Sequence, residues 1–142
     1  HAAVIGALPC DLYIGTAAVA DYTPVSASPC KLKKQAGQDG LSLQLVRTRD
    51  ILAEVAVHVR RPRVVVGFAA ETHDVEAYAR GKLAAKRVDL IAANQVGIAG
   101  GGFESDDNRL TVFATDGATS LGPAPKRELA DALLDLIEAR FA

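Results

Sequence analysis

Three short, almost uninterrupted apolar runs limit the fold of this chain more than any other feature. They span residues 11–18, 63–69 and 88–93, and polar residues hardly alternate within them. This pattern is typical of strands that are covered on both faces, as in parallel sheets. Helix patterns over residues 50–59 and roughly 74–86 connect the runs. Two successive strand–helix–strand passages predict adjacent parallel strands, and therefore an α/β fold: a Rossmann-like three-layer sandwich with a mostly parallel sheet.

The segments between these passages predict loops and one short strand. Residues 22–39 hold two prolines and are predicted to form a loop. Leucines alternate with other residues over 41–46, which indicates a short, half-buried strand. Residues 94–108 are rich in glycine, and we expect a long loop there.

The end of the chain predicts an antiparallel hairpin and a closing helix. Asp116-Gly117 is a strong turn signal between the strand patterns at 110–114 and 118–121. Pro125 is suited to the start of a helix. The apolar stripe of that helix should consist of Leu129, Leu133, Leu134, Ile137 and Phe141.

Composition narrows the class of function. The 142 residues suggest a single domain over 1–142 whose core is aliphatic, because 49% of residues are hydrophobic but only 5% are aromatic. The formal net charge of −1 gives no general attraction to nucleic acid or to a membrane surface, so neither is expected as a partner. Cys10 and Cys30 have neither disulfide nor metal-ligand spacing, and free thiols favour a cytoplasmic location.

Two groups of lysines are the candidate binding residues. Lys31 belongs to a cluster in the loop that follows the first apolar run, and Asp21 lies at the start of that loop. Lys82 and Lys86 are four apart on a predicted helix, so they share one face. From these residues alone, solvated lysines are the favoured interpretation of both groups, and Asp21 could equally cap a turn.

Four motifs, in order and at compatible spacing, change that balance. They are AAVADY, P-x-K-x-KK, VGFAAET and a K-x-x-x-K that leads into VDLIAAN. The chain resembles the bacterial phosphopantothenoylcysteine synthetase family from about Asp11 to its end. That activity forms the carboxyl-terminal half of a bifunctional coenzyme A biosynthesis flavoprotein. The resemblance implies a dimeric ligase, with homodimerisation through the loop and hairpin segments.

The implied reaction joins an acid to an amino acid at the expense of CTP. The carboxylate of 4′-phosphopantothenate attacks the α-phosphate of CTP with the assistance of Mg²⁺, and pyrophosphate leaves. The amine of cysteine then displaces CMP from the acyl-cytidylate. FMN would belong only to a fused decarboxylase domain outside these 142 residues.

The resemblance also assigns residues to the site. The lysine that matches Lys31 contacts phosphate and is important for catalysis in the family, and Asp21 matches an aspartate placed on the nucleotide. Phe68 matches a residue that borders the nucleotide, although a lone aromatic on an aliphatic strand is usually core. The predicted CTP-binding set is Gly15, Thr16, Ala17, Asp21, Lys31, Asp50, Phe68, Lys82 and Lys86, with Ala18 and Asn94 as weaker candidates and no protein metal ligand.

Two departures from the family leave an alternative open. Arg49 stands where the family commonly has proline, before the matching Asp50. The family also has an upstream segment, with a glycine-rich turn and an asparagine needed for the second half-reaction, and we expect that segment to lie outside this chain. The alternative is a non-catalytic nucleotide-binding or dimerisation module that needs the upstream segment. No G-x-S-x-G or G-x-G-x-x-G motif supports a hydrolase or a nicotinamide-binding protein.

Overall fold

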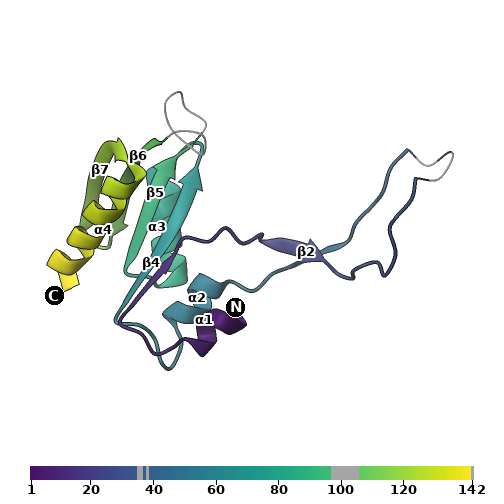
Figure 1. Cartoon of the computed structure of the whole chain (residues 1–142), viewed down its shortest axis with the longest axis horizontal. Helices are drawn as coiled ribbons and strands as arrows, with labels where there is room; N and C mark the ends of the chain where they lie inside the picture. Colours follow the sequence, from purple (N-terminus) through teal and green to yellow (C-terminus); the bar gives the residue numbers. More distant parts are fainter. Residues whose placement is uncertain (35–36, 38, 97–105, 142) are drawn as a thin grey trace. The chain divides into compact units, whose positions relative to one another are not determined.

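The computed structural model describes residues 1–34, 37, 39–96 and 106–141. The chain divides into two units (Figure 1). His1–Thr16 and Ile51–Ala142 make up the first unit, and Ala17–Asp50 make up the second.

A five-stranded sheet in the order β1-β4-β5-β6-β7 forms the centre of the first unit. β1 (Leu12–Gly15), β4 (Val64–Glu71) and β5 (Leu90–Gln95) are parallel neighbours. β6 (Asp107–Ala114) pairs antiparallel with β5, and β7 (Gly117–Pro125) pairs antiparallel with β6. All strands except β6 therefore point the same way, which confirms the predicted α/β sheet, its adjacent parallel strands and its antiparallel hairpin.

Helices cover both faces of this sheet, as expected for a three-layer sandwich (Figure 1). α2 (Ile51–Ala56) and α3 (Val75–Lys86) pack on one face, together with the short α1 (Ala2–Gly6). α4 (Lys126–Phe141) packs on the other. Among the described residues, no helix combines the length and the apolar character that a membrane crossing needs.

The side chains of β4 alternate between two cores. Val65 and Ala69 pack in the α2/α3 core, while Val64 and Val66 pack in the α4 core. All four are buried, which is why the strand shows no polar alternation in the sequence. Each fully buried valine stabilises the fold by about 1.5–3 kcal/mol relative to an exposed one.

One arginine joins the amino ends of β4 and β5 to the end of α2. Arg61 donates from Nε to the Ala56 carbonyl at 2.8 Å and from Nη2 to Asp89 Oδ2 at 2.7 Å. The same Asp89 oxygen accepts the backbone N–H of Val65 at 2.7 Å. Both charged side chains are about a third exposed or less, so these bonds are partly shielded from water.

The second unit contains a two-stranded antiparallel ladder of β2 (Tyr22–Pro24) and β3 (Leu45–Arg47). The Thr48 N–H extends the ladder by donating to the Asp21 carbonyl at 2.9 Å. Unlike the first unit, this one leaves most of its large apolar side chains exposed. They are Val19, Tyr22, Val25, Leu32, Leu41, Leu43, Leu45 and Val46.

The structure corrects several predicted boundaries. The predicted loop over 22–39 contains β2, and the strand predicted over 41–46 is exposed and is confined to β3. The predicted loop over 94–108 has strand residues at both of its ends, and its residues 97–105 lie outside the described part of the chain.

The closing helix differs from the prediction in two details. Pro125 is the last residue of β7, and the helix begins at Lys126. Leu134 is 47% exposed, and Leu136 packs against the α4 core in its place.

Candidate functional site

The carboxyl ends of the three parallel strands form one edge of the sheet, and several predicted site residues lie along it. Gly15 ends β1 and pairs with Gly67, while β4 continues four residues further to Glu71. Asn94 of β5 pairs with Ala70, also at this edge. Ligands of open α/β sheets bind beyond such an edge, because the strand ends open into loops there.

Lys82 reaches this edge from α3 through an ion pair with Glu71. Its Nζ donates to Glu71 Oε1 at 2.6 Å. The Glu71 side chain is only 16% exposed, whereas that of Lys82 is 40% exposed. The carboxylate therefore fixes the ammonium group at this edge, while the Lys82 side chain remains partly exposed to solvent.

Phe68 and Lys86 do not lie beside the Glu71–Lys82 pair. Phe68 is half-buried against the α4 core, on the face of the sheet opposite α3. Lys86 is the last residue of α3, one turn beyond Lys82 and farther from the carboxyl edge, because the helix runs back towards the start of β5.

Tyr13 is a residue of this edge that sequence reasoning missed. A Cβ atom added to Gly15 would lie 3.1 Å from Tyr13 Cε1, so the tyrosine ring takes the space beside the glycine. Burial raises the pKa of the Tyr13 phenol above its usual 10.0. A lone aromatic residue two positions before a strand end was the available signal.

Glu71 was also missed, although it stands inside the VGFAAET motif. Its partner is 11 residues away on the following helix. That pairing becomes visible only when α3 is packed against β4.

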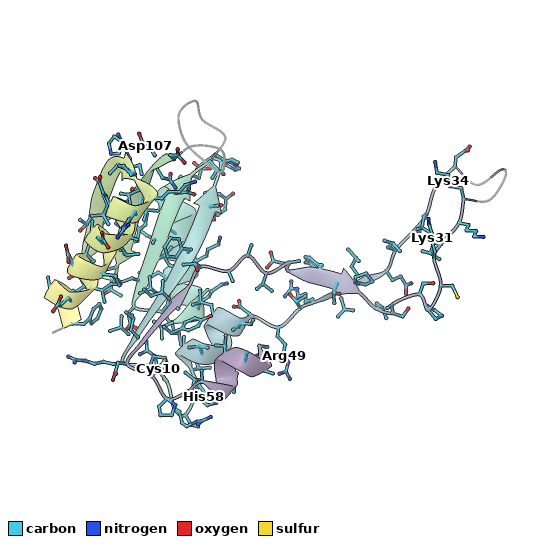
Figure 2. The ribbon with its side chains drawn as sticks, viewed as in Figure 1. Cys10, Lys31, Lys34, Arg49, His58 and Asp107 are labelled. Carbon is cyan, nitrogen blue, oxygen red and sulfur yellow. The ribbon has the colours of Figure 1, made fainter. Side chains whose placement is uncertain are left out.

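The remaining predicted residues belong to the second unit. Asp21 is exposed, and its backbone carbonyl accepts the Thr48 N–H. Lys31 follows a turn in which Ser28 Oγ donates to the Cys30 carbonyl at 2.6 Å. Figure 2 shows Lys31 and Lys34 in the segment that joins β2 to β3. Both lysines are exposed.

The junctions between the units carry the last predicted residues. Thr16 ends the first part of the first unit, and Ala17 and Ala18 begin the second unit. Asp50 ends the second unit, directly before α2. Within the described ranges, no group of three or more His, Cys, Asp or Glu side chains is arranged to hold a metal ion.

Comparison with known protein families gives a match over almost the whole chain. Residues 1–141 match the family model described as the DNA/pantothenate metabolism flavoprotein C-terminal domain. The coenzyme A biosynthesis bifunctional protein CoaBC of Vibrio cholerae is 46% identical over 130 residues, which are 92% of this chain and 33% of that protein. The protein of the same name from Bacillus subtilis is 52% identical over 107 residues, or 75% of this chain and 26% of that protein.

Solved structures give a consistent result. The crystal structure of the C-terminal domain of a coenzyme A biosynthesis bifunctional protein CoaBC aligns with a TM-score of 0.67 at 33% identity, covering 92% of this chain and 54% of that one. The DNA/pantothenate metabolism flavoprotein from Streptococcus pneumoniae aligns with a TM-score of 0.68 at 26% identity, covering 93% and 62%. The chain thus spans about a third of the length of the Vibrio cholerae protein.

Proposed function

This chain belongs to the family of DNA/pantothenate metabolism flavoprotein C-terminal domains, and from that premise we propose that it is the phosphopantothenate–cysteine ligase region of a coenzyme A biosynthesis protein. The relatives named above are coenzyme A biosynthesis bifunctional proteins. The observation that carries the proposal is the position of the family motifs. AAVADY follows the carboxyl end of β1, VGFAAET contains that of β4, and VDLIAAN reaches to one residue before that of β5, all at the same edge of the sheet.

The proposed chemistry is activation followed by amide formation in the cytoplasm. A bare carboxylate is a poor acylating agent, so the carboxylate of 4′-phosphopantothenate first attacks the α-phosphate of CTP and releases pyrophosphate. The cysteine amine then attacks the acyl carbon of the acyl-cytidylate and releases CMP. The tasks of the protein in both steps are to position the reactants and to stabilise developing negative charge.

In the first unit, three side chains are proposed to contact CTP. Lys82 and Lys86 would bind the triphosphate, since an ammonium group suits a mobile polyanion. Phe68 would border the nucleotide, with Asn94 as a weaker candidate. Gly15 and Thr16 end β1 without a bulky side chain, which supports close approach of the nucleotide to the backbone.

In the second unit, Lys31 is the proposed catalytic residue. Its ammonium group would contact phosphate and stabilise the charge on the departing pyrophosphate. Asp21 would accept hydrogen bonds from the ribose hydroxyls. The backbone at Ala17, with Ala18 as a weaker candidate, and Asp50 complete the proposed nucleotide site.

Mg²⁺ is the proposed metal, and it would accompany the triphosphate. This ion is commonly held by substrate phosphates together with water and one or two carboxylates, and it supplies neutralisation of phosphate charge when bound. No residue of this chain is assigned as its ligand. FMN is proposed only for a fused decarboxylase domain.

A homodimer is the proposed assembly. The second unit supports it, because eight large apolar side chains are exposed there on a segment with only a two-stranded ladder. An isolated two-stranded ladder is marginally stable in water, so a second copy of the chain would stabilise it by covering these side chains.

Calorimetric titration of the chain with CTP, ATP and UTP in the presence of Mg²⁺ tests the proposal directly. We expect CTP to bind and to be preferred over ATP. If none of the three nucleotides binds, the ligase proposal is wrong, and a structural or dimerisation module becomes the better account.

A second assay separates a ligase from a non-catalytic nucleotide-binding module. The chain covers 54% of the solved CoaBC C-terminal domain named above, so nucleotide binding without turnover is a specific alternative for it. Release of pyrophosphate and CMP with 4′-phosphopantothenate and cysteine should be measured on this chain and on a longer protein that contains the rest of that domain. We expect full turnover only from the longer protein.

A further inference from the structure

The ion pair between Glu71 and Lys82 differs from a second carboxylate–cation pair on α3, that of Glu76 and Arg80. Glu76 and Arg80 form an i,i+4 pair at 2.8 Å in which the carboxylate is 68% exposed. Glu71 comes from β4 instead, is 16% exposed and lies 2.6 Å from the Lys82 ammonium. A pair on the helix surface contributes little to stability, whereas a mostly buried carboxylate holds its partner in one place.

We propose that Glu71 is a positioning residue that holds Lys82 at the carboxyl end of β4 and offsets its charge, so that the site binds and releases polyphosphate reversibly. This inference rests on the proposed function of Lys82 as a triphosphate ligand. In that role Lys82 must attract CTP and also let pyrophosphate leave. The neighbouring Glu71 carboxylate weakens the contact of Lys82 with the phosphates of CTP and its contact with pyrophosphate alike.

The distances make the effect large enough to measure. An ammonium group that bonds both Glu71 and a phosphate oxygen keeps the two anions only about 4–6 Å apart, given ordinary hydrogen-bond lengths. Like charges at that separation repel by an energy that corresponds to about fourfold in a binding constant at the permittivity of bulk water, and to more than about a hundredfold at the permittivity typical of a protein surface. Because Lys82 is partly exposed, we expect an effect between these limits, of about tenfold. The repulsion grows with the number of phosphate charges, so it acts on CTP and pyrophosphate far more than on CMP.

The test is Glu71→Gln, which keeps the side-chain length and a carbonyl oxygen that accepts from Lys82 but removes the charge. We expect its affinity for CTP to rise about tenfold at ionic strengths below about 0.1 M. Affinity for inorganic pyrophosphate should rise in parallel, while affinity for CMP should change little. If Glu71 only held the fold together, Glu71→Gln would instead lower the affinity for all three ligands.

Three further variants complete the experiment. Glu76→Gln makes the same charge change in the exposed pair on the same helix, and it should leave CTP affinity unaltered. Glu71→Asp keeps the negative charge but moves it farther from the phosphate by one methylene group. Its increase in CTP affinity should therefore be smaller than that of Glu71→Gln. In a Lys82→Gln background, the gain in CTP affinity from Glu71→Gln should shrink, because Lys82 is the group that brings the phosphate close to Glu71.

The outcomes separate this inference from the function on which it rests. The inference is wrong, and the proposed function stands, if wild-type protein binds CTP but Glu71→Gln binds it no more tightly. The same holds if Glu71→Gln raises the affinity for CMP as much as that for CTP. If wild-type protein does not bind CTP, both are wrong.

Discussion

At the scale of single residues, lysines with the same charge are expected to differ because of what surrounds them. Lys82 is fixed by a mostly buried carboxylate, whereas Lys31 and Lys34 are both exposed in the segment between β2 and β3 (Figure 2). Lys31 is the proposed catalytic residue, and Lys34 is three residues away. The two residues therefore form a matched pair for mutagenesis.

We predict that Lys31→Gln lowers kcat far more than Lys34→Gln in a protein with ligase activity. A contact that stabilises charge in the transition state is worth about 10²–10³-fold in kcat, whereas a solvated lysine is worth little. Steady-state release of pyrophosphate measures the difference. Equal small effects would return Lys31 to the interpretation as a solvated loop lysine.

We predict that Gly67→Ala destabilises the first unit by about 1–3 kcal/mol, because the added methyl group overpacks a full core. Its Cβ would lie 2.5 Å from Leu52 Cδ2 and 2.9 Å from Ile91 Cδ1. Gly81→Ala on α3 is the control, since nothing lies within 4 Å of its added Cβ. The free energy of unfolding of that control should rise by about 0.5–1 kcal/mol, because alanine favours a helix more than glycine does. Urea denaturation measures both, and a neutral Gly67→Ala would show that α2 shifts freely.

At the scale of elements, side chains connect the helices to the sheet at its amino edge. Asp89 accepts from both Arg61 and the Val65 N–H, so one carboxylate connects β5, β4 and the segment after α2. At the same end of the sheet, Asp116 in the β6–β7 turn accepts from Arg140 in the last turn of α4.

Asp89→Ala should lower the free energy of unfolding by about 1–3 kcal/mol, because it leaves a partly buried N–H and a guanidinium nitrogen without their acceptor. Glu76→Ala breaks an exposed pair instead, and its effect should stay within about 0.5 kcal/mol. Chemical denaturation of the two variants beside wild type measures the contrast. If both variants lowered the free energy of unfolding by the same amount, water would be replacing the hydrogen bonds of Asp89 without a loss of stability.

The Asp116–Arg140 pair should make stability depend on pH. The hydrogen bond from Arg140 lowers the pKa of Asp116 below its usual 3.8. A lowered folded-state pKa means that the stabilisation is present above 3.8 and disappears as pH falls through the folded-state value. Wild type should therefore exceed Asp116→Asn in melting temperature at neutral pH, and the difference should vanish in strong acid. A constant difference at all pH values would contradict this.

At the scale of the whole molecule, the two units differ in how they bury apolar surface. The first unit has two aliphatic cores, one on each face of its sheet. The second unit exposes eight large apolar side chains. Its exposed leucines are the part of the chain best suited to contact a second copy.

We predict that the chain is a dimer by light scattering and that Leu43→Ser with Leu45→Ser shifts it to monomer. These side chains are 60% and 53% exposed, so the change removes apolar contact area without opening a core. Val59→Ser, at a 97% exposed position in the first unit, is the control and should remain dimeric. A wild-type monomer at high concentration would contradict the proposal.

The sequence by itself determined the parallel strands, the Asp116-Gly117 hairpin and the family. Each of these depends on signals that are local in the chain: an apolar run, a turn dipeptide, or a short motif. The family match and the observed strand order confirm these predictions. The candidate site residues were named from the same motifs, and their roles remain predictions.

Only the tertiary structure decided which residues meet across elements. β2 was not predictable, because a strand has no hydrogen bonds of its own and Tyr22–Pro24 pairs with residues more than 20 positions later. The Glu71–Lys82 pair likewise depends on how α3 packs against β4. Local patterns specify which face a residue presents, but its partner is set by the packing of segments distant in the sequence, which no local pattern contains.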